Sequence, residues 1–200
     1  MLAKRSSPAS KTYAVAGKTL AEINKDILKK GPADPNDGKR YAGSCRGTLT
    51  LAIGAKDFAF ATTPDSSPVE VTATVSGGSL TSTPAITMPK LASEKGLSPD
   101  ALKEWKRFVG KTQIHEDGHA DSFYTLAVAI AQEITATSAT GTGKDEKAAQ
   151  VAAQKALIDQ LGKTYGGGVL DGRINDDIKD YDAKTKHGAT QGAVLDTSIT

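Results

Sequence analysis

The sequence predicts an α+β fold, and three observations lead to this class. Apolar and polar residues alternate between Thr48 and Met88, which is the period-two pattern of β-strands. One amphipathic helix precedes this region, and helical spacing of apolar residues returns from Ser98 onward. Strands and helices that follow each other in blocks are typical of α+β proteins. We expect a mostly antiparallel sheet packed against one long helix, with further helices towards the C-terminus.

Length and composition are those of one globular domain. The 200 residues are 38 % hydrophobic and 24 % charged, which is enough for a single core. We expect a flexible lead over residues 1–11, one domain over residues 12–194 and a loose end over residues 195–200. The net charge of +2, with lysines scattered along the chain, argues against nucleic acid as a partner.

The first helix is marked by its capping residues. After a short strand over residues 13–17, Thr19 is the expected N-cap, Glu22 completes a capping box, and Gly31-Pro32 ends the run. The apolar stripe of this helix consists of Leu20, Ile23, Ile27 and Leu28.

The period-two region predicts four strands, over residues 48–54, 57–62, 69–76 and 79–89. Pro84 has no N–H to donate to a ladder, so the last strand is expected at an edge or with a bulge. An edge strand can accept an extended peptide, which matters if the substrate is a polypeptide.

Helices dominate the C-terminal half. Spacing after Ser98 predicts that Trp105 lies in the core, while Gly110 leaves open whether this helix continues into the next one. The second segment is expected to be one long buried helix. A loop over residues 135–145, a helix over residues 146–165, a glycine turn at 166–168 and a helix that ends near His187-Gly188 follow.

The motif His115-Glu116-x-x-His119 carries the chemistry. On a helix, four residues advance about 6 Å and about 400°, so the two imidazoles project from one face and can share a metal ion. Glu116 lies about 100° further round, where it reaches a water on that metal rather than the metal itself. This arrangement is typical of zinc hydrolases.

A catalytic zinc needs a third protein ligand, and His187 is the first candidate. Asp182, Asp180, Glu146 and Glu133 are the alternatives, of which Glu133 lies about 21 Å further along the same helix and is out of reach. A chance motif is the competing interpretation. It is weakened because all 3 histidines fall into two segments with the spacing or setting of metal ligands.

Several other residues have two interpretations each. Tyr181 is either a donor to the oxyanion of the reaction or an aromatic residue that packs at a helix end. Asp182 either binds metal or orients His187. Gly118 is expected to allow close approach of another segment to the helix. Cys45 is the only cysteine, so no internal disulfide forms, and a structural role is favoured over a reactive one.

Several spaced blocks resemble one family. YAVAGKTLAEINKDILKKGP, KRYAG, EWKRF, IHEDGH and YDAKTKHGATQG occur in an order similar to that of predicted secreted zinc-dependent proteases, first catalogued as a bacterial domain of unknown function. The resemblance implies a zincin-like metallopeptidase fold. It places His115, Glu116 and His119 on the active-site helix and His187 in the terminal block. It also implies export, so we expect a secreted or periplasmic protein whose signal peptide is absent from this chain, with a cytoplasmic location left open.

The sequence therefore predicts a zinc metallopeptidase that hydrolyses a peptide bond. Zn²⁺ is held by His115, His119 and His187, and Glu116 acts as general base. The alternative is a non-catalytic zinc-binding structural or interaction domain, and a ligand-binding module that uses the sheet edge is a weaker third hypothesis. The expected partner is a peptide or protein. No apolar run reaches the roughly eighteen residues of a membrane span.

Overall fold

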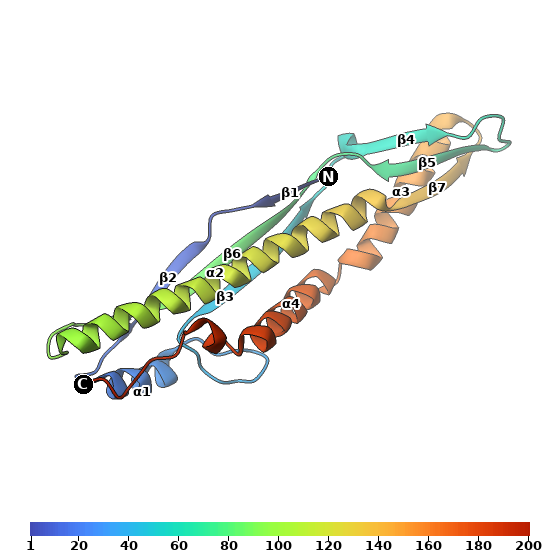
Figure 1. Cartoon of the computed structure of the whole chain (residues 1–200). Helices are drawn as coiled ribbons and strands as arrows, with labels where there is room; N and C mark the ends of the chain where they lie inside the picture. The colour runs from blue at the N-terminus through green and yellow to red at the C-terminus, as the bar shows by residue number, and fades with distance from the viewer. The chain divides into compact units, whose positions relative to one another are not determined.

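The computed structural model describes residues 1–200 and confirms the α+β class (Figure 1). The elements in chain order are β1 (Leu2–Arg5), β2 (Ala9–Val15), α1 (Leu20–Lys30), β3 (Ser44–Ala52), η1 (Ala55–Asp57), β4 (Phe58–Thr62), β5 (Val69–Val75), β6 (Ser79–Leu91), α2 (Pro99–Ala136), β7 (Ser138–Gly143), α3 (Glu146–Tyr165), α4 (Val169–Thr185) and η2 (Ala189–Gln191). No helix is long and apolar enough to cross a membrane.

The chain forms two compact units. The first consists of residues 1–6, 48–82 and 124–175, and the second of residues 7–47, 83–123 and 176–200. Each unit has its own cluster of buried apolar side chains. The structure therefore has two apolar clusters, whereas the sequence suggested a single core. That residues 12–194 form one domain stays a prediction.

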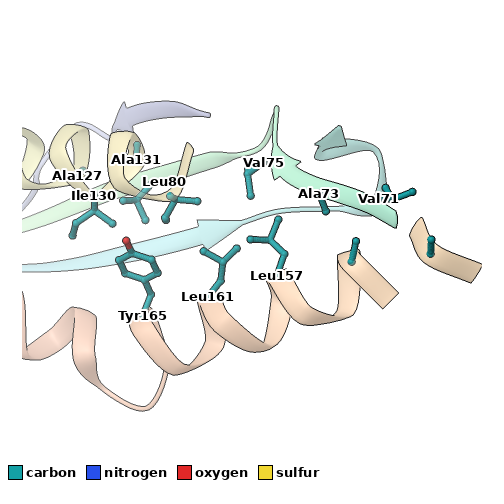
Figure 2. Close-up of a cluster of buried hydrophobic side chains, with 13 residues drawn as sticks. Val71, Ala73, Val75, Leu80, Ala127, Ile130, Ala131, Leu157, Leu161 and Tyr165 are labelled. Carbon is teal, nitrogen blue, oxygen red and sulfur yellow. The ribbon is translucent and has the colours of Figure 1, made fainter. Parts of the chain in front are cut away.

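The first unit contains the antiparallel sheet β4-β5-β7, with α3 packed against it. Side chains from β5, α2 and α3 point toward one another in its core (Figure 2). Ile130, Leu157 and Val71 are fully buried members of this cluster. Val75 on β5 is buried and pairs with Phe58 on β4. The alternation seen in the sequence therefore places apolar residues on the buried face of β5.

The loop prediction over residues 135–145 is wrong for its central part, because residues 138–143 form β7. A β-carbon on Gly141 or Gly143 would overlap the backbone of α3 at Ala153 or Ala149. Glycine on the strand and alanine on the helix therefore let β7 approach α3 closely. The small-residue composition that suggested a loop reflects this close packing.

The second unit contains β2, most of β6, α1 and the first part of α2. β2 runs parallel to β6, from the pair Ala9–Ala85 to the pair Val15–Leu91. α1 begins where the sequence predicts, with the Thr19 hydroxyl accepting the N–H of Glu22 at 3.2 Å. Val15, Leu20, Ile23, Ile27, Ala101, Trp105, Phe108 and Leu195 form its apolar cluster, which confirms Trp105 as a core residue.

Two predictions about the strands are corrected. The sheets are mixed rather than mostly antiparallel, because β1 and β2 both run parallel to β6. β6 is also interior rather than an edge, since it pairs with β1, β2 and β3. Pro84 is tolerated because residues 79–82 pair with β1 and residues 85–91 pair with β2, so Pro84 falls in the gap between them.

Both chain ends contact the rest of the structure, while their flexibility stays a prediction. The lead over residues 1–11 contains β1 and the start of β2, and both strands pair with β6. Residues 195–200 are anchored in the second unit by the buried Leu195 and by a 2.7 Å hydrogen bond from the Ser98 hydroxyl to the Thr200 carbonyl.

α2 answers the question left open by Gly110, because the helix runs without interruption from Pro99 to Ala136. A β-carbon at Gly110 would meet no atom within 4 Å, so this glycine has no packing role. The Ser98 hydroxyl accepts the N–H of Ala101 at 3.1 Å, as expected of an N-cap. One continuous helix thus carries the histidine motif.

Candidate metal site

The histidine motif lies in the second unit, on the part of α2 that is buried there. His115, Glu116 and His119 are 6 %, 3 % and 3 % exposed, which is unusual for such polar side chains. The two imidazole rings are 4.8 Å apart between centroids, as the spacing of four residues predicts. These three residues form a candidate metal-binding group.

The end of α4 brings a carboxylate to the histidines. Asp182 Oδ1 lies 3.2 Å from Nε2 of His115, 3.2 Å from Nε2 of His119 and 3.5 Å from Nδ1 of His187. Ile178 and Ile174 are buried one and two helical turns before Asp182, so the apolar stripe of α4 directs this carboxylate inward. Nitrogen atoms of all three histidines therefore converge on one oxygen atom.

His187 reaches this cluster through a tight turn after α4. Lys186 and His187 both have φ of 51°, and Gly188 follows with φ of 79°. The Tyr41 ring stacks on the His187 imidazole at a centroid distance of 4.4 Å and an interplanar angle of 15°. The Tyr41 hydroxyl donates to Asp37 at 2.7 Å, which fixes the stacking ring.

The remaining ligand candidates lie elsewhere. Glu133 binds Arg173 and Tyr165, and Glu146 accepts a hydrogen bond from Thr62. Asp180 is exposed on α4. A different aspartate, Asp34, instead forms a second candidate ligand group with Asp182 and His187.

The donor set fits a metal ion. Ligands at the 2.0–2.1 Å bond lengths of tetrahedral zinc are separated by about 3.3–3.4 Å, close to the distances around Asp182 Oδ1. Nδ1 of His119 and Oε2 of Glu116 are buried and have no hydrogen-bond partner within the protein. Imidazole and carboxylate ligands suit several divalent ions, so the donors indicate a metal site without defining the metal.

Electrostatics hold Asp182 ionised. Burial alone would raise the pKa of this carboxyl, but hydrogen bonds from His115 and His119 hold it well below its usual range. For His115, burial opposes protonation, yet the hydrogen bond to Asp182 and the nearby Glu116 raise its pKa overall. In the absence of metal, positive and negative groups therefore stabilise each other at this site.

The pKa of the Glu116 carboxyl is raised, in contrast to the lowered pKa of Asp182. Burial raises the pKa of its carboxyl to about 8, and the hydrogen bond from the Cys45 backbone opposes this only weakly. A β-carbon on Gly43 would overlap the Glu116 carboxylate, so glycine at this position leaves room for that carboxylate. Without metal this carboxyl therefore binds a proton more tightly than an exposed glutamate does.

A pocket opens onto this cluster within the second unit. It is lined by the segment between α1 and β3, by the first residues of β3, and by parts of α2 and α4, including Tyr41, Cys45, Glu116, His119, Asp182 and His187. The Cys45 thiol forms no disulfide and is buried. Glu116 and all three histidines thus line one pocket.

The Tyr181 ring packs against the rings of both motif histidines. Its ring centroid is 4.6 Å from His119 and 5.4 Å from His115. Its hydroxyl fills the space in which a β-carbon on Gly118 would lie, which is the close approach predicted for that glycine. The same hydroxyl accepts the side-chain N–H of Gln191 at 3.0 Å.

Sequence reasoning did not single out Gln191 or Tyr41. Gln191 Oε1 lies 2.9 Å from Nδ1 of His115, although 76 residues separate the two in sequence. The only available signal was its place in the block YDAKTKHGATQG, which carries no spacing rule for a contact with α2.

Together, these features define an α+β protein with a buried candidate metal site on one long helix. The family described as "Bacterial protein of unknown function (DUF922)" matches residues 10–188. The match covers most of the chain, so the protein belongs to this family. No curated protein and no solved structure matches the chain.

Proposed function

We propose that this protein is a zinc-dependent metallopeptidase with a zincin-like catalytic helix. The observation that carries the proposal is the setting of Glu116. Its buried carboxyl follows directly after a metal-competent histidine, lines the pocket, and has one oxygen without a partner in the protein. A structural metal site has no need of such a carboxyl, whereas hydrolysis of an amide needs a base beside the metal.

The residues that would hold zinc are His115 and His119, with His187 or Asp182 as further ligands. A bound zinc ion would supply a Lewis acid that polarises a carbonyl group and lowers the pKa of a water molecule. The positive charge would also lower the pKa of Glu116 from the value set by burial, so that its carboxylate is free to accept a proton.

In the proposed reaction Glu116 takes a proton from the attacking water and later transfers it to the leaving amine. Burial of both histidines keeps bulk water from competing for their lone pairs. Tyr181 as an oxyanion donor is less well supported, because its hydroxyl lies against Gly118 and accepts from Gln191. Packing beside the histidines is the better supported interpretation of Tyr181.

The proposed substrate is a peptide bound in extended form beside β3. Ser44, Cys45 and Arg46 at the start of β3 line the pocket, and β3 pairs with β6 alone among the strands. The sequence suggested β6 as the edge strand, but β6 is interior. We therefore propose that a peptide adds to the free edge of β3. Secretion or a periplasmic location is proposed from the resemblance noted for the sequence.

A second function is favoured by one observation. His115, His119, Asp182 and His187 offer four donors, and a site closed by four protein ligands is typical of structural zinc. In that case the metal ties the segment after α4 to α2 and no substrate is cleaved.

Glu116→Gln separates the two functions, because glutamine has the shape of the protonated glutamate. Metal content and cleavage of a broad peptide library are measured for wild type, Glu116→Gln and the control Asp117→Asn, whose residue is exposed and bonded to Gln113. A peptidase is expected to bind metal in all three proteins and to lose cleavage only in Glu116→Gln. Metal binding without cleavage in wild type would favour the structural site.

A further inference from the structure

We infer that Arg46 is a specificity-determining residue that binds a carboxylate group of the substrate, an inference that rests on the proposed peptidase function. Arg46 lies near the start of β3 and lines the pocket that also contains Glu116 and the motif histidines. It is the one lysine or arginine among the residues that line this pocket. A carboxylate that enters the pocket therefore meets one permanently charged cation.

The Arg46 guanidinium is held at the pocket while most of its donors stay available. One of its terminal nitrogen atoms donates to the Ala33 carbonyl at 2.8 Å. The arginines of α2 and α4, Arg107 and Arg173, are each paired with a glutamate, whereas Arg46 forms no ion pair. A guanidinium has five N–H donors in a planar arrangement that matches both oxygen atoms of a carboxylate. Arg46 can therefore bind a carboxylate without giving up its bond to Ala33.

The segment between α1 and β3 fixes the carbonyl to which Arg46 donates. Ala33 forms an isolated antiparallel bridge with Arg40, and the Asp34 N–H donates to the Lys39 carbonyl at 2.8 Å. The Ala33 carbonyl thus belongs to a small hydrogen-bonded hairpin. Because this contact holds the guanidinium in place before any ligand arrives, less side-chain entropy is lost when a carboxylate binds.

The position of Arg46 along β3 places it beside the proposed general base. Cys45 directly precedes Arg46, and the Cys45 backbone donates a hydrogen bond to the Glu116 carboxylate. Successive residues of a strand are only about 3.3 Å apart, so a peptide added to the free edge of β3 runs past Glu116 and Arg46 together. The carboxylate that Arg46 binds should therefore lie within about two residues of the bond that is cleaved.

The acidic residues of the pocket have other partners than Arg46. Asp182 contacts the two motif histidines at 3.2 Å. Asp34 accepts the Asn36 N–H at 2.7 Å and belongs to a candidate ligand group with Asp182. A metal ion at the histidines would offset the negative charge of this region. The guanidinium of Arg46 is thus left to bind an anion that comes from outside the protein.

The test measures binding of four acetylated tetrapeptides to the full chain carrying Glu116→Gln, with and without Zn²⁺. Three of the peptides have an amidated C-terminus and differ only in one residue, which is glutamate, glutamine or lysine. The fourth has glutamine and a free C-terminal carboxylate, so the set separates the two sources of a carboxylate in a peptide. Titrations followed by NMR at the Nε–H resonance of Arg46 report both the Kd and the site of binding.

Arg46→Glu and Arg46→Gln are compared with the matched control Arg40→Glu. Arg40 is exposed and donates to the Gly31 carbonyl of the same segment at 2.6 Å, but it does not line the pocket. Reversal of the charge at Arg46 changes which peptide is preferred, an effect that a merely structural role would not produce.

With Arg46 in place, one of the two carboxylate peptides should bind about 10-fold more tightly than the amidated glutamine peptide. Arg46→Gln should remove this preference, Arg46→Glu should reverse it in favour of the lysine peptide, and Arg40→Glu should keep it. Equal binding of all four peptides, no binding of any of them, or a preference unchanged in Arg46→Gln would overturn the inference. Cleavage by wild type is measured separately. Its absence would reject the proposed function, while the binding preference would still decide the role of Arg46.

Discussion

The hydroxyl group of Tyr181 occupies the space in which a β-carbon on Gly118 would lie. Gly118 sits between the two motif histidines, and Tyr181 contacts both of their rings. A single hydrogen atom in place of a methyl group on α2 therefore allows α4 to present Tyr181 and the neighbouring Asp182 to the histidines.

Gly118→Ala should weaken both the fold and the metal site. The new methyl group displaces the Tyr181 ring, and overpacking of this kind typically costs about 1–3 kcal/mol in the free energy of unfolding. The displaced ring also disturbs the rings of both motif histidines, so Zn²⁺ affinity should fall. Urea unfolding and chelator competition measure the two effects.

Gly110→Ala is the matched control on the same helix. A β-carbon there meets nothing within 4 Å, so alanine should stabilise the protein by about 1 kcal/mol through its higher helix propensity. Zn²⁺ affinity should not change. If both glycine variants were equally stabilised, the contact between Gly118 and Tyr181 would have no energetic weight.

The Glu104–Arg107 pair should make the stability of the second unit depend on acid pH. Hydrogen bonds from Arg107, opposed by burial, lower the pKa of Glu104 below its ordinary value of 4.5. The folded state therefore binds this proton less tightly than the unfolded state. The contribution is fully present above about pH 4.5 and is lost as pH falls through the folded pKa.

Glu104→Gln is the variant for this test. It should lower stability at neutral pH by about 1 kcal/mol, a modest value because the Arg107 side chain is 41 % exposed. The difference from wild type should shrink at pH values below the folded pKa. Denaturant unfolding across the pH range measures it, and a difference that stayed constant with pH would contradict the role of the charge.

Local sequence signals predicted the elements that depend on local physics. The Thr19 cap, the alternation in β5 and the spacing of His115 and His119 all arise from neighbours within a few residues. Each is confirmed in the structure. The sequence narrowed the third ligand to His187 or Asp182. In the structure Asp182 contacts both motif histidines, and His187 contacts Asp182.

Features that depend on long-range pairing were missed. The parallel pairing of β2 with β6 and the strand β7 are determined by partners far away in sequence, and their polar or small side chains give little periodicity. Gln191 was missed for the same reason, since its partner His115 lies on another element. Functional contacts between elements that are distant in sequence are therefore hard to predict from a single sequence.

Substitutions at Asp182 and His187 should differ in effect. Asp182 is buried and reaches both motif histidines at 3.2 Å, whereas the His187 side chain is 38 % exposed and lies 3.5 Å from Asp182. We expect Asp182→Asn to weaken Zn²⁺ binding more than His187→Ala. Metal stoichiometry and the visible spectrum of the Co²⁺-substituted protein measure this order, and a spectrum unchanged in Asp182→Asn would exclude Asp182 as a ligand.

Removal of metal should destabilise the second unit selectively. A ligand at a free concentration 1,000 times its Kd stabilises a fold by about 4 kcal/mol. All candidate ligands belong to the second unit, so chelation should raise hydrogen exchange in α2 residues 99–123 and in residues 176–200. Exchange in β5 and α3, which build the core of the first unit, should stay the same.

The variant His115→Ala should show the raised exchange before chelation and no further change after it. Equal effects in both units would mean that metal binding stabilises the whole chain rather than the unit that supplies its ligands.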